Sequence, residues 1–173
     1  MAKKTKPNRG LFRGFFMPLA LLASCQMAPE NLLLNADEYD IAGVKVGMSE
    51  AEVIKILGKP DNIVTIFSGG DHVDFVYGEL TVSMSARGAN LDSPKLVSNI
   101  WSKNSSHCFN SVICPGDSLK AIMAQLGETK ITEADNGKAD KVFYLLPNLE
   151  TCWLWVLTKD YEISSEITIA CQP

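Results

Sequence analysis

Two segments of the chain carry apolar residues at the spacing of an amphipathic helix, and each has a start and a stop signal. The first begins with a Ser-x-x-Glu capping box at Ser49 and ends at Gly58, and the second begins at Asp117 or Ser118 and ends at Gly127. The apolar stripes consist of Val53, Ile56 and Leu57, and of Leu119, Ile122, Met123 and Leu126. Helices of about ten residues are unstable alone, so both are expected to pack against other elements.

Strand-like runs with turn residues between them follow each expected helix. The expected strands are 63–67, 73–77, 80–84 and 96–101, and then 130–134, 141–146, 151–158 and 162–171. The order of a helix and then an antiparallel meander therefore occurs twice. This order predicts an α+β fold, in which two tandem helix-plus-meander repeats form a two-layer sandwich with the helices on one face of the sheet.

The two helical segments also resemble each other in sequence at an offset of 69 residues. Gly47-Met48-Ser49 aligns with Gly116-Asp117-Ser118, and the segment 53–58 aligns with 122–127. Self-similarity at a fixed offset indicates a duplicated structural unit. The expected units are repeat 1 over 41–103 and repeat 2 over 104–173.

The first 24 residues have the composition of an export signal. Five basic residues precede an apolar run over 14–24, and no acidic residue occurs before Glu30. The run is about half of the ~20 residues that a membrane-spanning helix needs, and Pro18 interrupts it. It ends in Leu22-Ala23-Ser24-Cys25, which resembles the lipobox of bacterial lipoproteins. The alternative is an ordinary secretory leader with a chance cysteine.

The lipobox resemblance implies that residues 1–24 are removed and that Cys25 is lipidated, with acyl chains such as palmitate. Each buried methylene of such a chain contributes ~0.8 kcal/mol to membrane binding. Residues 25–40 are then the lipidated N-terminus and a tether. Under the bacterial sorting convention, Gln26 at the next position favours the outer membrane. The expected location is therefore a periplasm-facing lipoprotein of the bacterial outer membrane.

Removal of the leader makes the remaining chain strongly acidic. The full chain has 16 basic and 20 acidic residues, and five of the basic ones lie in the leader, so 11 against 20 gives a net charge of about −9. A surface of this sign repels nucleic acid and anionic lipid headgroups, whereas a basic protein partner is compatible with it.

The four cysteines beyond Cys25 form an even set, which is typical of disulfides in an exported protein. Three pairings are possible. Cys108 and Cys114 enclose a short loop before the second expected helix, and Cys152 and Cys171 lie on neighbouring expected strands, so local pairing is the prediction. A four-cysteine metal site is the alternative, but the chain has no CxxC spacing.

The segment 46–60, with Gly47-Met48-Ser49 at its start and Leu57-Gly58-Lys59-Pro60 at its end, resembles a family signature. It is similar to the signature of the small outer-membrane assembly lipoproteins called SmpA/OmlA or BamE-like. It is similar also to the helix repeat of the β-lactamase inhibitory protein, which has two tandem units and two local disulfides. The second copy matches weakly, because Asp117 replaces Met48. The resemblance implies the fold of these proteins but does not identify the partner.

Catalytic motifs are absent from the sequence. His72 and Asp74 form a His-x-Asp pair that could begin a metal site, but their place at an expected hairpin predicts a solvated turn instead. His107 stands alone beside Cys108. No phosphate loop, nucleophile elbow or zinc helix occurs. We therefore expect no enzyme activity, no cofactor and no metal.

The aromatic residues of the strand 151–158 are the candidate contact residues. If Cys152 pairs with Cys171, alternation places Trp153 and Trp155 on the open face of the sheet, away from the helices. Tryptophan is enriched among residues that dominate binding energy. Phe143 would join this face if Tyr144 points to the core. The alternative places both tryptophans in the core, and Trp101 is expected in the core as well.

Two functions from different classes follow from these observations. The first is a lipid-anchored periplasmic module that binds another envelope protein through its open sheet face. Such a module would act as an outer-membrane assembly or scaffold factor, or as an inhibitor of an envelope or secreted enzyme. The second is a small enzyme or a ligand or metal carrier, which would use the His72 and Asp74 pair or a cleft between the two units.

Overall fold

The computed structural model describes residues 38–67, 71–86, 93–127, 130–133, 139–149, 151–159 and 162–172. These residues form two helices and ten strands. In chain order the elements are β1 (Asp40–Ile41), β2 (Val44–Lys45), α1 (Glu50–Leu57), β3 (Asn62–Phe67), β4 (Asp71–Tyr77), β5 (Leu80–Ala86), β6 (Lys95–Ser102), α2 (Leu119–Leu126), β7 (Lys130–Glu133), β8 (Ala139–Leu145), β9 (Cys152–Lys159) and β10 (Ile163–Cys171). Neither described helix is long and apolar enough to span a membrane.

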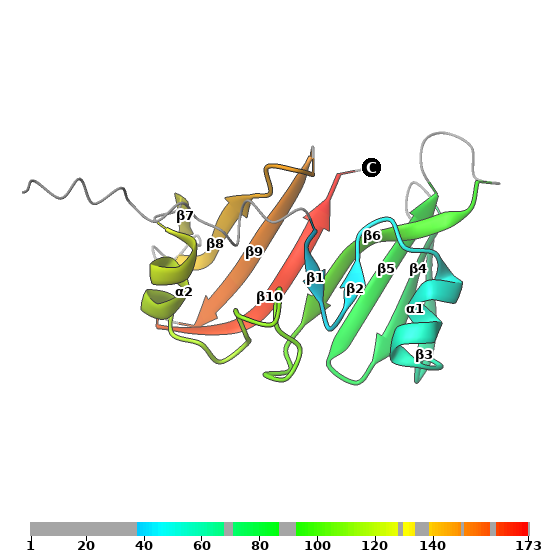
Figure 1. Ribbon diagram of the computed structural model, residues 1–173, viewed down its shortest axis with the longest axis horizontal. Coiled ribbons are helices and arrows are strands. Elements are labelled where there is room, and N and C mark those ends of the chain that lie inside the picture. The colour runs from blue at the N-terminus through cyan, green and yellow to red at the C-terminus, as the bar shows by residue number, and fades with distance from the viewer. Residues whose placement is uncertain are drawn as a thin grey trace, which may run out of the picture.

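One eight-stranded antiparallel sheet dominates the molecule (Figure 1), with the strand order β3-β4-β5-β6-β10-β9-β8-β7. The last strand of each half of the chain, β6 and β10, meets the other at the centre of the sheet, where Ile100 is opposite Ile169 and Trp101 is opposite Thr168. The strands β1 and β2 form a separate small hairpin. The two halves of the chain therefore share one continuous sheet.

The expected fold class, an α+β sandwich of two helix-plus-meander repeats with the helices on one face, is wrong. The described chain is mostly β, and each helix has only eight residues. Helix α1 buries only Val53, while Ile54 is 36% exposed and Ile56, which was expected in its apolar stripe, is 44% exposed. Helices this short cover little of an eight-stranded sheet, so other segments complete the layer.

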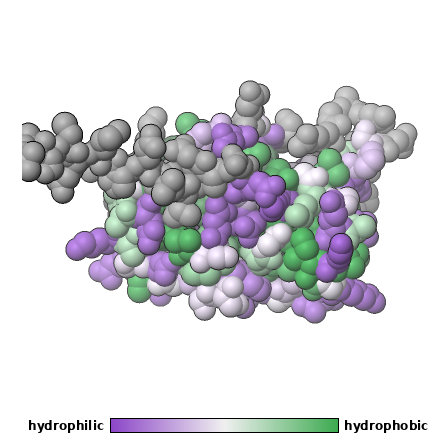
Figure 2. Space-filling model, in the orientation of Figure 1, coloured by the Kyte–Doolittle hydropathy of each residue, from purple (hydrophilic) through white to green (hydrophobic). Residues whose placement is uncertain are grey.

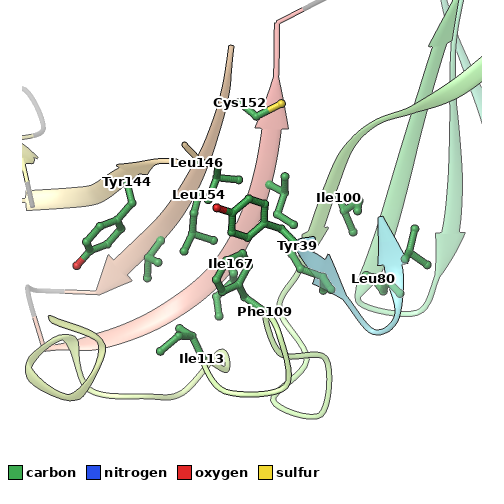
Figure 3. Close-up of a cluster of buried hydrophobic side chains, with 14 of the residues drawn as sticks. Tyr39, Leu80, Ile100, Phe109, Ile113, Tyr144, Leu146, Cys152, Leu154 and Ile167 are labelled. Atoms are coloured by element: carbon green, nitrogen blue, oxygen red, sulfur yellow. The ribbon is translucent and has the colours of Figure 1, made fainter. Parts of the chain in front are cut away.

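The middle of this layer is made by the β1–β2 hairpin and by the loop between β6 and α2. Tyr39 and Phe109 stack with ring centroids 5.8 Å apart, and both side chains are buried. They project over the strands that carry Leu154 and Ile167 (Figure 3). Tyr39, which was expected in the tether, therefore belongs to the core.

The helix termini are formed by the predicted signals. The Ser49 backbone N–H donates to the Glu52 carboxylate at 2.8 Å, and this bond lowers the pKa of Glu52. In α2 it is Ser118 rather than Asp117 that caps the helix, because its Oγ accepts from the backbone N–H of Ala121 at 3.2 Å. Each helix is followed by a glycine with φ near 82°, a conformation that side-chain-bearing residues rarely adopt.

Candidate binding face

The open face of the sheet, opposite the helices and the β1–β2 hairpin, carries the candidate contact residues. Along β9, Leu154 and Val156 are fully buried toward the helices, whereas Trp153 and Trp155 are half-buried on the other side. The prediction that both tryptophans lie on the open face is therefore confirmed. The alternative, with both tryptophans in the core, is wrong.

The strand register brings a third tryptophan to the same place. Trp155 on β9 is opposite Thr168 on β10, and Thr168 is in turn opposite Trp101 on β6. In the next row Ala170 lies between Trp153 and Asn99. Since strands are ~4.8 Å apart, the backbones that carry the two outer tryptophans of a row are ~10 Å apart. The smaller Thr168 and Ala170 form the floor between them.

These residues enclose a shallow cavity of about 340 Å³, which we call the tryptophan cradle. Its lining consists of Asn99, Trp101, Trp153, Trp155, Thr168, Ala170, Cys171 and Gln172. Three indole rings thus surround a small, partly open hollow on a rigid sheet.

The expectation that Trp101 lies in the core is wrong, and the reason is a β-bulge. The register between β5 and β6 shifts between Ser83 and Met84, so that Met84 is opposite Val97 while Ser83 is opposite Asn99. As a result both Val97 and Ile100 face the core, although they are three residues apart. Strict alternation from Val97 would point Trp101 into the core. The bulge shifts the alternation by one residue, so Trp101 points into the cradle instead.

Phe143 and Lys141 extend the aromatic surface beyond the cradle. Phe143 on β8 is opposite Trp155 and half-buried, as predicted, while Tyr144 points to the core. The Tyr144 hydroxyl donates to the Gly127 carbonyl at 3.1 Å, and burial raises the pKa of Tyr144 to about 12. The Lys141 ammonium lies 3.9 Å from the Trp155 ring centroid, a cation–π contact.

Polar groups at the rim of the cradle are held in fixed positions. The Asn99 side-chain oxygen accepts from the Cys171 backbone N–H at 2.9 Å, which orients the Asn99 amide. The Glu166 carboxylate accepts from Thr168 Oγ1 at 3.2 Å and lies 3.6 Å from the Lys103 ammonium. These contacts fix the orientation of the polar groups at the rim.

Both predicted disulfides are formed. Cys108 pairs with Cys114, and Cys152 pairs with Cys171. The second bridge joins β9 to β10 one register position beyond the Trp153 and Ala170 pair, so it fixes one end of the cradle. Cys25, the predicted lipidation site, lies outside the described residues.

The His72 and Asp74 pair does not lie in a solvated turn, and that expectation is wrong. Both residues are part of β4, and Asp74 is only 8% exposed and accepts a hydrogen bond from Ser83 on β5. Their side chains share the open face with the cradle, but β5 separates Asp74 from Asn99. Among the described residues, no three His, Cys, Asp or Glu side chains form a possible metal site. His107 Nδ1 lies 3.4 Å from Ser102 Oγ, in the loop after β6.

A second hollow lies near the disulfide end of the same strands. Its volume is about 410 Å³, and its lining consists of Val46, Ser85, Leu96, Val97, Ser98, Asn148, Leu149, Thr151, Cys152, Cys171 and Gln172. The lining combines hydroxyl, amide and apolar groups, and both cysteines in it are bridged. The lining contains no titratable side chain next to the hydroxyl groups of Ser85, Ser98 and Thr151.

Comparison with known proteins shows a similarity of fold only. No protein-family model and no curated protein matches the chain. A solved structure of an extracellular protein containing an SCP domain, from Bacillus anthracis strain Ames, is similar with a TM-score of 0.51 and 8% sequence identity. The similarity covers 73% of this chain and 44% of that protein. Since the identity is so low, the likeness shows a shared fold alone, and the BamE-like resemblance stays a prediction.

Proposed function

We propose that this chain is a lipid-anchored protein-binding module of the bacterial envelope that holds another envelope protein on its open sheet face. The tryptophan cradle is the observation that carries the proposal. Three half-buried indole rings surround one hollow, and Phe143 continues the aromatic surface on the next strand. Tryptophan truncation at the centre of an interface often costs 2 kcal/mol or more of binding free energy, roughly.

The cradle is suited to binding because its backbone is rigid. Its residues lie on or directly after three neighbouring strands of the sheet, β6, β10 and β9, and the Cys152–Cys171 bridge ties two of these strands together. A site that is already ordered loses little conformational freedom on binding, so more of the contact energy becomes affinity. The cradle lining is mainly aromatic and contains no titratable side chain, which supports a binding role over an enzymatic one.

The proposed cellular role is that of an assembly or scaffold factor at the outer membrane. The leader, the lipobox at Cys25 and Gln26 support the location, and the BamE-like motif at 46–60 supports the role. An inhibitor of an envelope or secreted enzyme would use the same face, and the two local disulfides favour this second role. The identity of the captured protein distinguishes them, since an inhibitor partner is an active enzyme that loses activity in the complex.

Site-specific photo-crosslinking of the full chain in the native envelope tests the proposal. The probe replaces Trp101, Trp153 or Trp155 in turn, and mass spectrometry identifies each adduct. A probe at Ile163, which is 50% exposed outside the cradle, is the matched control. One discrete adduct from the cradle positions and none from position 163 is the expected result.

A double variant then measures the contribution of the cradle. Trp153→Ala with Trp155→Ala is expected to weaken capture of the crosslinked protein while the fold and both disulfides persist. Ile163→Ala is the control for loss of an exposed apolar side chain and should bind normally. Unchanged capture by the folded double variant would exclude the cradle as the binding surface.

A further inference from the structure

The two edges of the eight-stranded sheet differ in how they are protected. One edge, β7, has only four residues, begins with Lys130 and ends with Glu133, and carries a register shift next to Glu133. Short length, charge and irregularity are the features that prevent edge strands from pairing with other chains. The other edge, β3, has six residues, no charged residue, no proline and an unbroken register with β4. Of the two edges in the described part of the chain, β3 is therefore the one open to a further strand.

Exposed apolar side chains gather at this unprotected edge. Eight large hydrophobic side chains are strongly exposed among the described residues, and five of them belong to α1 and β3: Ile54, Ile56, Ile63, Val64 and Ile66. Helix α1 and β3 lie at the same end of the molecule (Figure 1), where Figure 2 shows hydrophobic surface over α1. Val64 and Ile66, opposite Asp74 and His72, lie on the open face, whereas Ile63, opposite Phe75, lies on the core face. Exposed apolar side chains on both faces of one edge indicate an interaction site.

The sequence of β3 shows which occupant fits. Around Thr65 the strand reads Ile63-Val64-Thr65-Ile66-Phe67, so apolar residues are arranged symmetrically on both sides of one threonine. A two-fold symmetric contact requires such self-complementarity, because each position meets its mirror position in the second copy. Pairing with a strand of an unrelated protein would not require this symmetry in the sequence of β3.

The backbone hydrogen bonds agree with pairing about Thr65. The Ile63 N–H donates to the Asn62 side chain at 2.9 Å in an exposed bond, so it points away from β4. Backbone groups alternate in direction along an antiparallel strand, so those of Thr65 and Phe67 also point away from β4. Two copies centred on Thr65 would then exchange about six backbone hydrogen bonds across the new edge.

We propose that β3 pairs antiparallel with β3 of a second copy of this chain about a two-fold axis at Thr65, which joins the two sheets into one. In this register Val64 is opposite Ile66 of the second copy, and Ile63 is opposite Phe67. No like charges meet in the pairing, and threonine meets threonine at the axis, a pair that stabilises antiparallel sheets. The contact is three strands away from β6, the nearest strand of the cradle, so the pairing can form whether or not the cradle binds a partner.

Cysteine crosslinking of the full chain in the native compartment tests the pairing and its register. Directly opposite residues of a hydrogen-bonded pair have Cα atoms ~5.5 Å apart, a distance that a disulfide spans. Thr65→Cys should therefore give a reducible band of twice the monomer mass. Val64→Cys alone should stay monomeric, whereas differently tagged Val64→Cys and Ile66→Cys chains expressed together should crosslink. Ile163→Cys is the matched control at an exposed strand position and should stay monomeric.

Other outcomes overturn the proposal. Absence of the Thr65→Cys dimer would exclude it, as would equal crosslinking of Ile163→Cys. Crosslinking of Val64→Cys to itself would exclude the register, and an adduct of Thr65→Cys with a different protein would exclude the second copy as occupant. A second measurement uses no cysteine: Thr65→Lys places two ammonium groups opposite each other, and sedimentation equilibrium should show the mass halved relative to the unaltered chain.

Discussion

The two disulfides close loops of different size, and their separate contributions to stability are predicted to differ. Cys152 and Cys171 are 19 residues apart in sequence, whereas Cys108 and Cys114 are 6 apart. A crosslink removes loop-closure entropy from the unfolded chain, and the amount removed grows with the logarithm of loop length. For these lengths the larger loop contributes ~3.2 kcal/mol and the smaller ~2.2 kcal/mol to the free energy of unfolding at room temperature.

Two double variants isolate these contributions, because each is compared with itself in the oxidised and the reduced state. Cys108→Ala with Cys114→Ala retains only the larger loop, and Cys152→Ala with Cys171→Ala retains only the smaller. Urea unfolding of each variant is measured in the oxidised and the reduced state. Because the two states share every side chain, their difference reports the crosslink alone.

The expected result is a larger effect of reduction on the variant that keeps Cys152 and Cys171. The predicted difference between the variants is ~1 kcal/mol, which corresponds to a factor of about five in the unfolding equilibrium constant. Equal effects, or a larger effect for the shorter loop, would refute the loop-entropy reasoning. Such a result would point to native-state packing, since Cys152 is a core residue with 4% exposure.

Four further substitutions test side-chain burial, helix capping and the pH dependence of stability. Leu154→Ala should cost about 2–5 kcal/mol of unfolding free energy because the residue is fully buried, and Trp155→Ala should cost clearly less in the same urea assay. Ser118→Ala removes the α2 cap that accepts from the N–H of Ala121 and should cost ~1 kcal/mol, measured by thermal unfolding. Burial raises the pKa of Tyr144 from 10 to about 12. The contribution of Tyr144 to the free energy of unfolding is therefore complete below pH 10 and is lost as the pH rises toward 12. Tyr144→Phe should flatten this alkaline loss of stability in a pH titration.

The strand faces could be predicted where alternation is unbroken. In β9 no register shift interrupts the run from Cys152 to Leu157, so the period of two places Leu154 inside and the tryptophans outside. The disulfide pairing was equally accessible, because each pair is close in sequence and next to an expected element. The same reasoning failed at Trp101, because a bulge changes the period by one residue and leaves no mark in the sequence of a single chain.

The fold class could not be predicted because part of the second layer has no periodic sequence. Tyr39 and Phe109 come from segments without a helical or strand pattern, yet they stack in the core. The apolar stripe of α1 suggested more helix burial than the structure has, since Ile56 is 44% exposed. Periodicity identifies regular elements, whereas contacts between irregular segments distant in sequence depend on the assembled fold.

Edge pairing through β3 would also affect how strongly the protein holds an anchored partner. A two-fold axis perpendicular to the sheet joins the two sheets edge to edge, so a dimer carries two tryptophan cradles. Trp155 lies on β9, five positions from β3 in the sheet order. At ~4.8 Å per strand the two Trp155 positions would be ~53 Å apart along the sheet.

Two linked sites bind a dense surface of partners far more tightly than one site, by a factor of 10² or more, roughly, when both can engage at once. Thr65→Lys is therefore expected to weaken binding to densely immobilised partner while leaving binding to the same partner in solution unchanged. Trp153→Ala with Trp155→Ala should instead weaken binding in both formats, because it damages each site rather than the link between them. Equal binding of Thr65→Lys and the unaltered chain on the dense surface would show that the cradles act singly, even if the chains pair at β3.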